Sequence, residues 1–444
     1  MKRILMKTVY FFSPVILIMT LLVTNTDKYS NLGLLITMIF GSFAYTWISY
    51  QFVLSSRPKF IETSFGMDKL YQFHGLMAIV SISIAIIHAI VNEQLLGKSF
   101  ITTLGGLSLG LFILISLLAM LLMSPTFILK YRPFKWLKIK IDNWKKFSYE
   151  QLRIIHNLTL VAFVVLNVHV LLTSNAREYA HVRTLYWIYM IISVVFYIYH
   201  KYIKQEFLQK NPYLIVDTKQ ENSLIWTIKM RAKKKSIKRD LPGQFAFFSF
   251  KTEVQKFEEH PFSISFSNKL ELSITVKKLG DFTNKISNLK IGDEVLVEGP
   301  FGRFSYLLYP KEKETIFIAG GIGITPILSM LRYMSVHEPN RKVLLIWGIN
   351  TLSDFICKDE LYLLAKTMSK LSIVPVVAYD DDYQGERGYI DSRIINKTCL
   401  KENINMSSAG FYICGPKQLT QISTSTLKNS GIKKKRIHFE KFSL

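Results

Sequence analysis

The chain has 444 residues, enough for two or three domains, and combines 49% hydrophobic residues with a formal net charge of +24. This balance favours an anionic membrane surface over a nucleic acid, because the lysines cluster beside apolar segments and no nucleic-acid-binding motif occurs. The three cysteines, Cys357, Cys399 and Cys414, form no CxxC pair, which argues against a zinc or iron–sulfur site, covalently attached c-type haem and a disulfide framework. We therefore expect the C-terminal part to lie in the cytosol.

Six apolar windows are each long enough to cross a bilayer, which takes roughly 20 helical residues. The first window follows the basic stretch "MKRILMK", but no small-residue cleavage site comes after it. We therefore interpret it as an uncleaved helix and not as a signal peptide. The expected membrane helices cover residues 8–26, 32–54, 69–92, 103–124, 152–173 and 184–203.

Lysine and arginine are unevenly distributed between the loops that join these windows. Most lie in one alternating set of loops, which includes the N-terminal stretch and residues 129–147, whereas the other set holds only Lys28, Lys98, Arg177 and Arg183. By the positive-inside rule, we expect an integral protein of the plasma membrane with both termini in the cytoplasm. Residues 129–147 mix aromatic and basic side chains, so they fit an interfacial segment at the lipid headgroups or a solvated basic loop.

The third and fifth windows each contain two histidines, His74 with His88 and His156 with His169, at spacings of 14 and 13 residues. Because both helices run in the same direction, the four imidazoles form two levels across the bundle. An intramembrane histidine is costly without a partner, and a haem iron between two neutral imidazoles supplies one. A metal-ion site and a proton relay are the alternatives. About 20 Å along each helix separates its two histidines, too far for them to share an ion.

The 13-residue spacing places a constraint on the fifth helix. On an ideal helix, 14 steps return to within about 40° of the same face, whereas 13 steps do not. We therefore expect this helix to bend, to tighten or to hold its two haems at different azimuths. Because histidine would fill both axial positions of each iron, such haems could only pass electrons.

Beyond about residue 210 the pattern changes to short alternating runs such as "SLIWTIKM" and "ELSITVKKL", which predict a small antiparallel barrel. From about residue 312, strands alternate with helices, as in a parallel α/β sheet. At the first strand-to-helix turn lies "AGGIGITP", residues 319–326. Glycines at such a turn let backbone amides approach a phosphate at a helix N-terminus, although a plain tight turn is the alternative.

Together these segments resemble the NADPH oxidase and ferric reductase family, in which haem helices are fused to a dehydrogenase unit of the ferredoxin–NADP reductase type. The resemblance covers roughly residues 8–444 and implies three domains: a six-helix transmembrane haem bundle at 1–210, an FAD-binding β-barrel at 211–310 and an NAD(P)-binding parallel α/β domain at 311–444. It also implies two b-type haems, one bound by His74 and His156 and the other by His88 and His169.

The resemblance further implies roles for short motifs in the C-terminal half. "HPFSIS" resembles the strand that flanks the flavin ring, "KKLGDFT" a turn at the FAD pyrophosphate, and "GPFG" the turn into the nucleotide domain. "GGIGITP" resembles the loop for the nucleotide pyrophosphate, "CGP" the element that places a cysteine beside the nicotinamide, and "IHFEKFSL" an aromatic tail that covers the flavin. The residues so implied are His260, Pro261, Phe262, Ser263, Lys277, Gly280 and Thr283 for FAD, Gly320, Gly321, Gly323, Thr325, Gly415 and Pro416 for NADPH or NADH, and Cys414 and Phe442 as catalytic residues that also contact the cofactors.

The resemblance implies electron transfer from cytosolic NAD(P)H through FAD and both haems to an acceptor outside the cell. FAD is needed because NAD(P)H donates a hydride, whereas haem accepts one electron at a time. The acceptor is dioxygen, giving superoxide, or a ferric or cupric chelate; a third possibility is an electron-relay subunit for an extracytoplasmic partner. The short outer loops offer such a partner little surface, so we expect no obligate protein partner.

Two positions bear on the acceptor and the nucleotide. Oxidases of this family commonly carry a histidine four residues after the second ligand of the third helix, where this chain has Asn92. They also carry an arginine near the outer end of the second helix, but none occurs between Arg3 and Arg57. Asn350, where relatives often have arginine, favours NADH or dual use, with Lys358 as an alternative cation for a 2′-phosphate.

Overall fold

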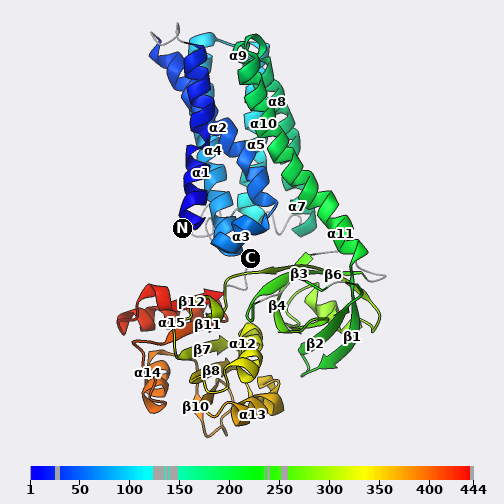
Figure 1. Ribbon diagram of the computed structural model, residues 1–444, viewed down its shortest axis with the longest axis vertical. Helices are drawn as coiled ribbons and strands as arrows, with labels where there is room; N and C mark the ends of the chain where they lie inside the picture. The colour runs from blue at the N-terminus through cyan, green and yellow to red at the C-terminus, as the bar shows by residue number, and fades with distance from the viewer. Residues whose placement is uncertain are drawn as a thin grey trace. The chain divides into compact units, whose positions relative to one another are not determined.

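The computed structural model describes residues 2–25, 31–123, 149–234, 236–237, 241–251 and 259–440, together with Trp136 and Lys140 (Figure 1). It contains two compact units, residues 1–203 and 204–444. Each unit has its own apolar clusters of buried side chains. The predicted interfacial segment at 129–147 lies outside the described residues apart from Trp136 and Lys140, and so does Phe442.

The first unit consists of helices. Six stretches are long and apolar enough to cross a membrane, at residues 4–24, 32–55, 67–96, 100–121, 151–172 and 180–210, which agrees with the six predicted spans. Many large apolar side chains in them, such as Ile79, Leu114 and Val164, point outward, as lipid-facing residues do. The helices are α1 (Lys2–Thr24), α2 (Leu32–Ser55), α3 (Lys59–Phe65), α4 (Met67–Leu96), α5 (Phe100–Met123), α7 (Tyr149–Asn157), α8 (Thr159–Leu172), α9 (Ser174–Glu178) and α10 (Ala180–Ile198), followed by a π-helical turn (Tyr199–Ile203).

The fifth span is interrupted at Leu158, between α7 and α8 and two residues after His156. The amide of Leu158 donates to the carbonyl of Ile155, and the amide of Val161 donates to the carbonyl of Leu158, so the chain makes three-residue turns there. Three-residue turns rotate the chain further per residue than an α-helix does. Tightening is one of the three outcomes that the 13-residue histidine spacing left open for this helix.

Polar contacts join helices inside the bundle. The hydroxyl of Tyr45 on α2 lies 2.9 Å from Asn167 Oδ1 on α8 and 2.9 Å from the carbonyl oxygen of Tyr186 on α10. The hydroxyl of Ser193 on α10 lies 2.8 Å from the carbonyl oxygen of Ser49 on α2. Such hydrogen bonds help to fix helix pairing where lipid provides no hydrophobic drive between helices.

The second unit begins with α11 (Lys204–Lys210) and continues into a closed antiparallel barrel with the strand order β1-β2-β5-β4-β3-β6, as predicted. Inward-facing side chains such as Ile228, Phe248 and Ile274 are fully buried in it. A short 3-10 helix, η4 (Thr283–Asn288), follows β5. The strands are β1 (Tyr213–Gln220), β2 (Ile225–Ala232), β3 (Phe245–Lys251), β4 (Glu259–Ser267), β5 (Glu271–Lys277) and β6 (Glu294–Phe301).

The predicted parallel α/β sheet follows, with the strand order β10-β9-β8-β7-β11-β12. Helices α12 and α13 pack on one face and α14 and α15 on the other. The strand order reverses beside β7, so the loops after β7 and β11 diverge at a switch point, where such sheets bind ligands. The elements are β7 (Thr315–Gly320), α12 (Ile324–His337), β8 (Val343–Ile349), α13 (Lys358–Thr367), β9 (Leu371–Val377), β10 (Glu386–Arg387), α14 (Ser392–Lys401), β11 (Gly410–Cys414), α15 (Lys417–Asn429) and β12 (Ile437–Glu440).

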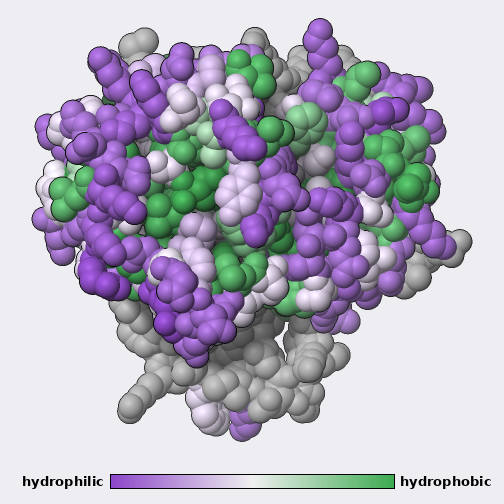
Figure 2. All heavy atoms as spheres, turned by 90° about the horizontal axis from the view of Figure 1, so that it is seen from below, coloured by the Kyte–Doolittle hydropathy of each residue, from purple (hydrophilic) through white to green (hydrophobic). Residues whose placement is uncertain are grey.

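The face of the molecule seen in Figure 2 carries mainly hydrophilic side chains with smaller apolar areas between them. The strands of the sheet are buried on both faces, since Ile316 and Ile318 belong to one apolar cluster and Phe317 to the other. This is the arrangement expected when helices cover both sides of a parallel sheet.

Arg332 on α12 joins the barrel to the sheet. Its Nη1 donates to the carbonyl oxygen of Ser265 on β4 at 2.6 Å. Its Nε and Nη2 donate to the two carboxylate oxygens of Glu360 on α13 at 2.6 and 2.7 Å. A guanidinium suits this task because its donors lie in one rigid plane. The strand with the predicted flavin motif is thus fixed to the helix that follows the glycine loop.

We predict that Arg332→Ala lowers the free energy of unfolding of the full-length protein by about 1–3 kcal/mol, since hydrogen bonds to a charged group are lost. Thermal unfolding followed by flavin fluorescence measures this effect. Arg387→Ala is the matched control. Its pair with Asp381 is exposed, so a loss within about 1 kcal/mol is expected. Equal losses in the two variants would contradict the role assigned to Arg332.

Candidate functional sites

Two of the four predicted haem ligands face each other across the bundle. His74 lies on α4 and His156 near the end of α7, and their ring centroids are 6.4 Å apart with an interplanar angle of 73°. Nδ1 of each ring is buried and has no hydrogen-bond partner among the residues that the structure describes. A buried polar nitrogen without a partner is unfavourable, so the described part of the chain does not by itself satisfy these two rings.

His88 on α4 and His169 on α8 have a different environment. Nδ1 of His88 lies 2.9 Å from the carbonyl oxygen of Thr37, and Nδ1 of His169 lies 2.8 Å from that of Ile101. A carbonyl oxygen only accepts, so Nδ1 carries the proton and Nε2 is left with a free electron pair. That is the tautomer required to bind a metal through Nε2.

These residues fit two haems. Each level offers two imidazoles, the number of axial ligands that a six-coordinate haem iron takes from the protein. Gly41 and Gly105 lie directly against the rings of His88 and His169, where an added Cβ would come within 2.9 Å of the imidazole. No group of three or more histidine, cysteine, aspartate or glutamate side chains in the described part of the chain could hold a bare metal ion.

The structure brings the two predicted flavin elements together. His260 on β4 stacks on Phe282 of the "KKLGDFT" turn, with ring centroids 3.7 Å apart and an interplanar angle of 18°. Pro261, Phe262 and Ser263 continue along β4, paired with Phe247, Ala246 and Phe245 of β3. The sequence did not single out Phe282, because its contact with His260 depends on the closed barrel.

The predicted pyrophosphate turn is held by its own threonine. The Thr283 hydroxyl accepts hydrogen bonds from the amides of Leu279 and Gly280, both at 2.9 Å. Lys277 is the last residue of β5 and lies opposite Ile225 of β2. The turn is therefore held by hydrogen bonds within the protein, and Lys277 lies three residues before Gly280.

The glycine loop and the "CGP" element lie against each other, although about 90 residues separate them in the chain. They follow β7 and β11, which are paired in parallel with Cys414 opposite Ala319. A Cβ on Gly323 would lie 2.2 Å from the carbonyl oxygen of Cys414, and a Cβ on Gly415 would lie 2.9 Å from the amide nitrogen of Gly320. Only glycine permits this close approach.

Other residues shape the same loop. Gly321 has a φ of 52°, a left-handed conformation that favours glycine, and its carbonyl oxygen accepts from Trp347 Nε1 at 3.0 Å. The Thr325 hydroxyl donates to the carbonyl oxygen of Ile322 at 2.7 Å. Pro416 precedes the first residue of α15. The N-terminus of α12 follows directly, so the loop has the form of a phosphate-binding turn.

Cys414 is completely buried at the end of β11. Burial, and to a smaller extent the charge of Glu440, raises the pKa of its thiol well above the usual range. The thiol therefore stays neutral at physiological pH. This suits a packing or positioning role beside a nicotinamide and does not suit a thiolate nucleophile.

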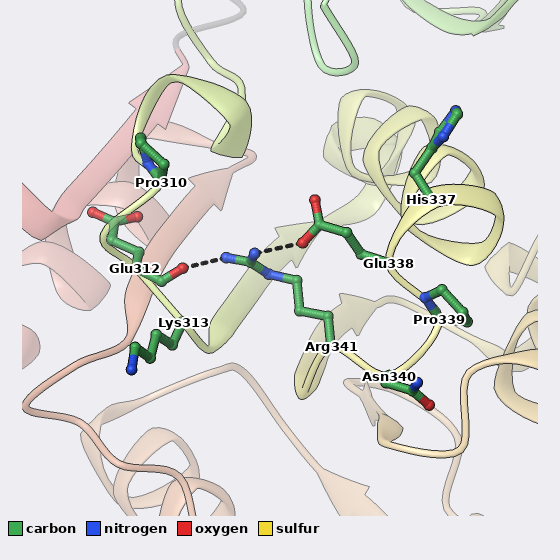
Figure 3. A pocket seen from close by; sticks show the side chains of 8 residues that line it. All are labelled: Pro310, Glu312, Lys313, His337, Glu338, Pro339, Asn340 and Arg341. Atoms are coloured by element: carbon green, nitrogen blue, oxygen red, sulfur yellow. Dashed lines mark hydrogen bonds and ion pairs between the residues drawn. The ribbon is translucent and has the colours of Figure 1, made fainter.

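A hollow at the opposite edge of the sheet does not belong to this site (Figure 3). It lies near the starts of β7 and β8, and its central side chain, Arg341, is already engaged. Arg341 donates to the backbone oxygen of Glu312, to Glu338 Oε2 at 2.7 Å and to Thr315 Oγ1 at 2.8 Å. These bonds hold the segment that connects the barrel to the sheet.

A buried network anchors the C-terminal strand. His438 Nε2 on β12 lies 2.8 Å from Glu312 Oε1, and the hydroxyl of Tyr412 on β11 donates to Glu312 Oε2 at 2.6 Å. The His438 ring also stacks on Tyr309 with centroids 3.8 Å apart. The strand that leads into the predicted aromatic tail is thus fixed at a defined register.

Three protein families match successive parts of the chain. They are described as "Ferric reductase like transmembrane component" over residues 40–167, "FAD-binding domain" over residues 227–305 and "Oxidoreductase NAD-binding domain" over residues 317–425. The matches support FAD and NAD(P)H as cofactor and substrate of an oxidoreductase, and they support a location in a membrane. The haems are implied only through the ferric reductase family.

Curated relatives include the electron transfer component of 2-halobenzoate 1,2-dioxygenase from Burkholderia cepacia, 29% identical over 46% of this chain and 59% of its own length. A flavohemoprotein from Oceanobacillus iheyensis is 28% identical over 46% of this chain and 51% of its length. Human cytochrome b5 reductase 4 is 29% identical over 37% of this chain and 32% of its own length. The chain thus spans about a third to three fifths of the length of these relatives.

Among solved structures, the flavohem-like FAD/NAD-binding domain of nitric oxide dioxygenase from Vibrio cholerae is 21% identical, with a TM-score of 0.46. It covers 52% of this chain and 97% of its own. A flavohemoglobin from Malassezia yamatoensis is 17% identical, with a TM-score of 0.48, and covers 92% of this chain and 96% of its own.

We predict that Gly323→Ala raises the dissociation constant for NADH at least about tenfold, or roughly 1.4 kcal/mol, because the new Cβ pushes the loop from Cys414. Titration of the full-length protein with NADH measures this. Gly431→Ala is the control for lost stability. Gly431 has a φ of 79°, so an alanine there should cost about 1–2 kcal/mol of backbone strain. It follows α15, toward the opposite edge of the sheet from the glycine loop, so the affinity for NADH should not change. Unchanged affinity in Gly323→Ala would refute this assignment.

We predict that iodoacetamide does not alkylate Cys414 in the folded protein at pH 7.5, because the thiol is buried and its raised pKa leaves almost no thiolate. Mass spectrometry after denaturation, with a second label for thiols protected in the native state, measures the modification. Rapid native alkylation would show that the thiol is accessible and ionised, contrary to the structure.

Proposed function

The chain has the architecture of the NADPH oxidase and ferric reductase family, and from this premise we propose that it is a transmembrane NAD(P)H oxidase. It would take electrons from cytosolic NAD(P)H and deliver them to dioxygen outside the cell, giving superoxide. When bound, FAD converts the hydride into single electrons and two b-type haems carry these across the bilayer. The observation that carries the proposal is the two histidine levels in one apolar bundle, fused to an FAD- and NAD-binding unit.

In the reductase unit, the glycine loop and the N-terminus of α12 would bind the nucleotide pyrophosphate through backbone amides. Cys414, Gly415 and Pro416 would hold the nicotinamide, since they lie against that loop. His260 to Ser263 would line the flavin ring, and Lys277, Gly280 and Thr283 would hold the FAD pyrophosphate. Phe442 would stack on the flavin and move aside for the nicotinamide.

In the membrane unit, His74 and His156 would bind one haem, and His88 and His169 the other. With both termini in the cytoplasm, the first pair lies on the cytoplasmic side and the second on the outer side. An inside-negative membrane potential favours outward electron movement by about 2.3 kcal/mol per 100 mV. No protein partner is needed in this scheme beyond the lipid bilayer, NAD(P)H and the acceptor.

A ferric or cupric chelate is the second candidate acceptor. Asn92 on α4 stands where oxidases of this family commonly have histidine, which favours an acceptor that does not need a designed oxygen pocket. For the nucleotide, Asn350 follows β8 and Lys358 begins α13, with its Nζ 5.9 Å from the Tyr362 ring centroid. Asn350 offers no positive charge for a 2′-phosphate, and this supports NADH or dual use.

One assay distinguishes the acceptors. The full-length protein, purified with FAD and haem, receives NADH or NADPH under air, and nucleotide oxidation is followed together with cytochrome c reduction. Reduction of cytochrome c that superoxide dismutase suppresses supports the oxidase. Turnover only after addition of a ferric chelate rejects it in favour of the metal reductase, and turnover with neither indicates an extracytoplasmic partner.

We predict that the double variant His74→Leu/His156→Leu retains one haem per chain by pyridine haemochrome assay and loses NADH-driven reduction of the extracellular acceptor. Flavin reduction by NADH should persist, because the reductase unit is unchanged. His181→Ala is the matched control. His181 is not one of the four assigned ligands, and its Nε2 lies 2.8 Å from Thr24 Oγ1. Both haems should therefore remain in this variant. Two haems in the double variant would contradict the assigned ligands.

A further inference from the structure

His88 and His169 share a packing arrangement that His74 and His156 lack. In each case Nδ1 meets the carbonyl oxygen of a residue four positions before a glycine: Thr37 before Gly41 on α2, and Ile101 before Gly105 on α5. The same device thus occurs twice, on two pairs of helices.

The glycines make this approach possible. A Cβ on Gly41 would lie 2.9 Å from Cε1 of His88, and a Cβ on Gly105 would lie 2.9 Å from Cε1 of His169. Real Cβ atoms essentially never approach another atom this closely. Any other residue at Gly41 or Gly105 would therefore push the imidazole away and lengthen its bond to the backbone carbonyl.

The other histidine pair has no such support. Nδ1 of His74 and Nδ1 of His156 find no acceptor within the described ranges of the chain. Gly75, beside His74, faces open space where an added Cβ would meet no described atom within 4 Å. The two levels therefore differ in whether the imidazole Nδ1–H donates to a backbone carbonyl.

We propose that this difference orders the redox potentials of the two haems, so that the one held by His88 and His169 has the lower midpoint potential. A hydrogen bond from Nδ1–H to a carbonyl makes Nε2 a stronger electron donor, which stabilises ferric over ferrous iron. Among the described residues His74 and His156 have no such acceptor, so they stabilise the ferric state less. The inference rests on the proposed function, because it requires that all four histidines bind haem.

Anaerobic potentiometric titration of the full-length protein, followed by haem absorbance, tests the order. Two single-haem variants are compared, His74→Leu/His156→Leu and His88→Leu/His169→Leu. The haem that remains in the first variant should titrate at the lower potential. Equal potentials or the reverse order overturn the inference, whereas absence of haem from the unmodified protein would refute the proposed function itself.

The glycine contacts are tested separately in the protein with both haems. Gly41→Ala and Gly105→Ala should each raise the lower midpoint potential and leave the higher one in place. Gly33→Ala is the matched control on α2, because its Cβ would meet the flexible Leu95 side chain, at 2.7 Å, and Asn31 Oδ1, at 3.2 Å, but no histidine. A shift of the higher midpoint potential instead, or an equal shift of the lower one in Gly33→Ala, contradicts the assigned role of the two glycines.

Discussion

The membrane half of this protein depends on the cost of placing an imidazole in hydrocarbon. Each of the four histidines has two ring nitrogens that need partners, and lipid provides none. For His88 and His169, a backbone carbonyl takes Nδ1–H and leaves Nε2 for a ligand. The short approach to Gly41 and Gly105 helps to place these rings.

The reductase half depends on close packing between two loops at a switch point of the sheet. Gly323 touches the carbonyl of Cys414, and Gly415 touches the amide of Gly320, so the glycine loop and the "CGP" element form one surface. Arg332 then ties this region to β4, the strand with the flavin motif. A hydride can pass only between groups held in a fixed mutual position, and these contacts supply that rigidity.

The two units divide the chemistry according to their surroundings. Apolar side chains cover the outside of the helical unit, as suits a unit that lies in a membrane. The second unit has apolar clusters enclosed by a barrel and by helices on both faces of a sheet, as a water-exposed unit requires. In it, Cys414 remains a neutral thiol because burial disfavours the thiolate.

The sequence by itself determined the six apolar helices, the barrel, the parallel sheet and the spacing of the histidines along their helices. These follow from local periodicity and from spacing along one helix or strand. Only the tertiary structure decided that Thr37 and Ile101 accept from the histidines, that Phe282 stacks on His260 and that Arg332 reaches Ser265. The physical reason is that such contacts depend on which helices and strands become neighbours, which no local pattern specifies.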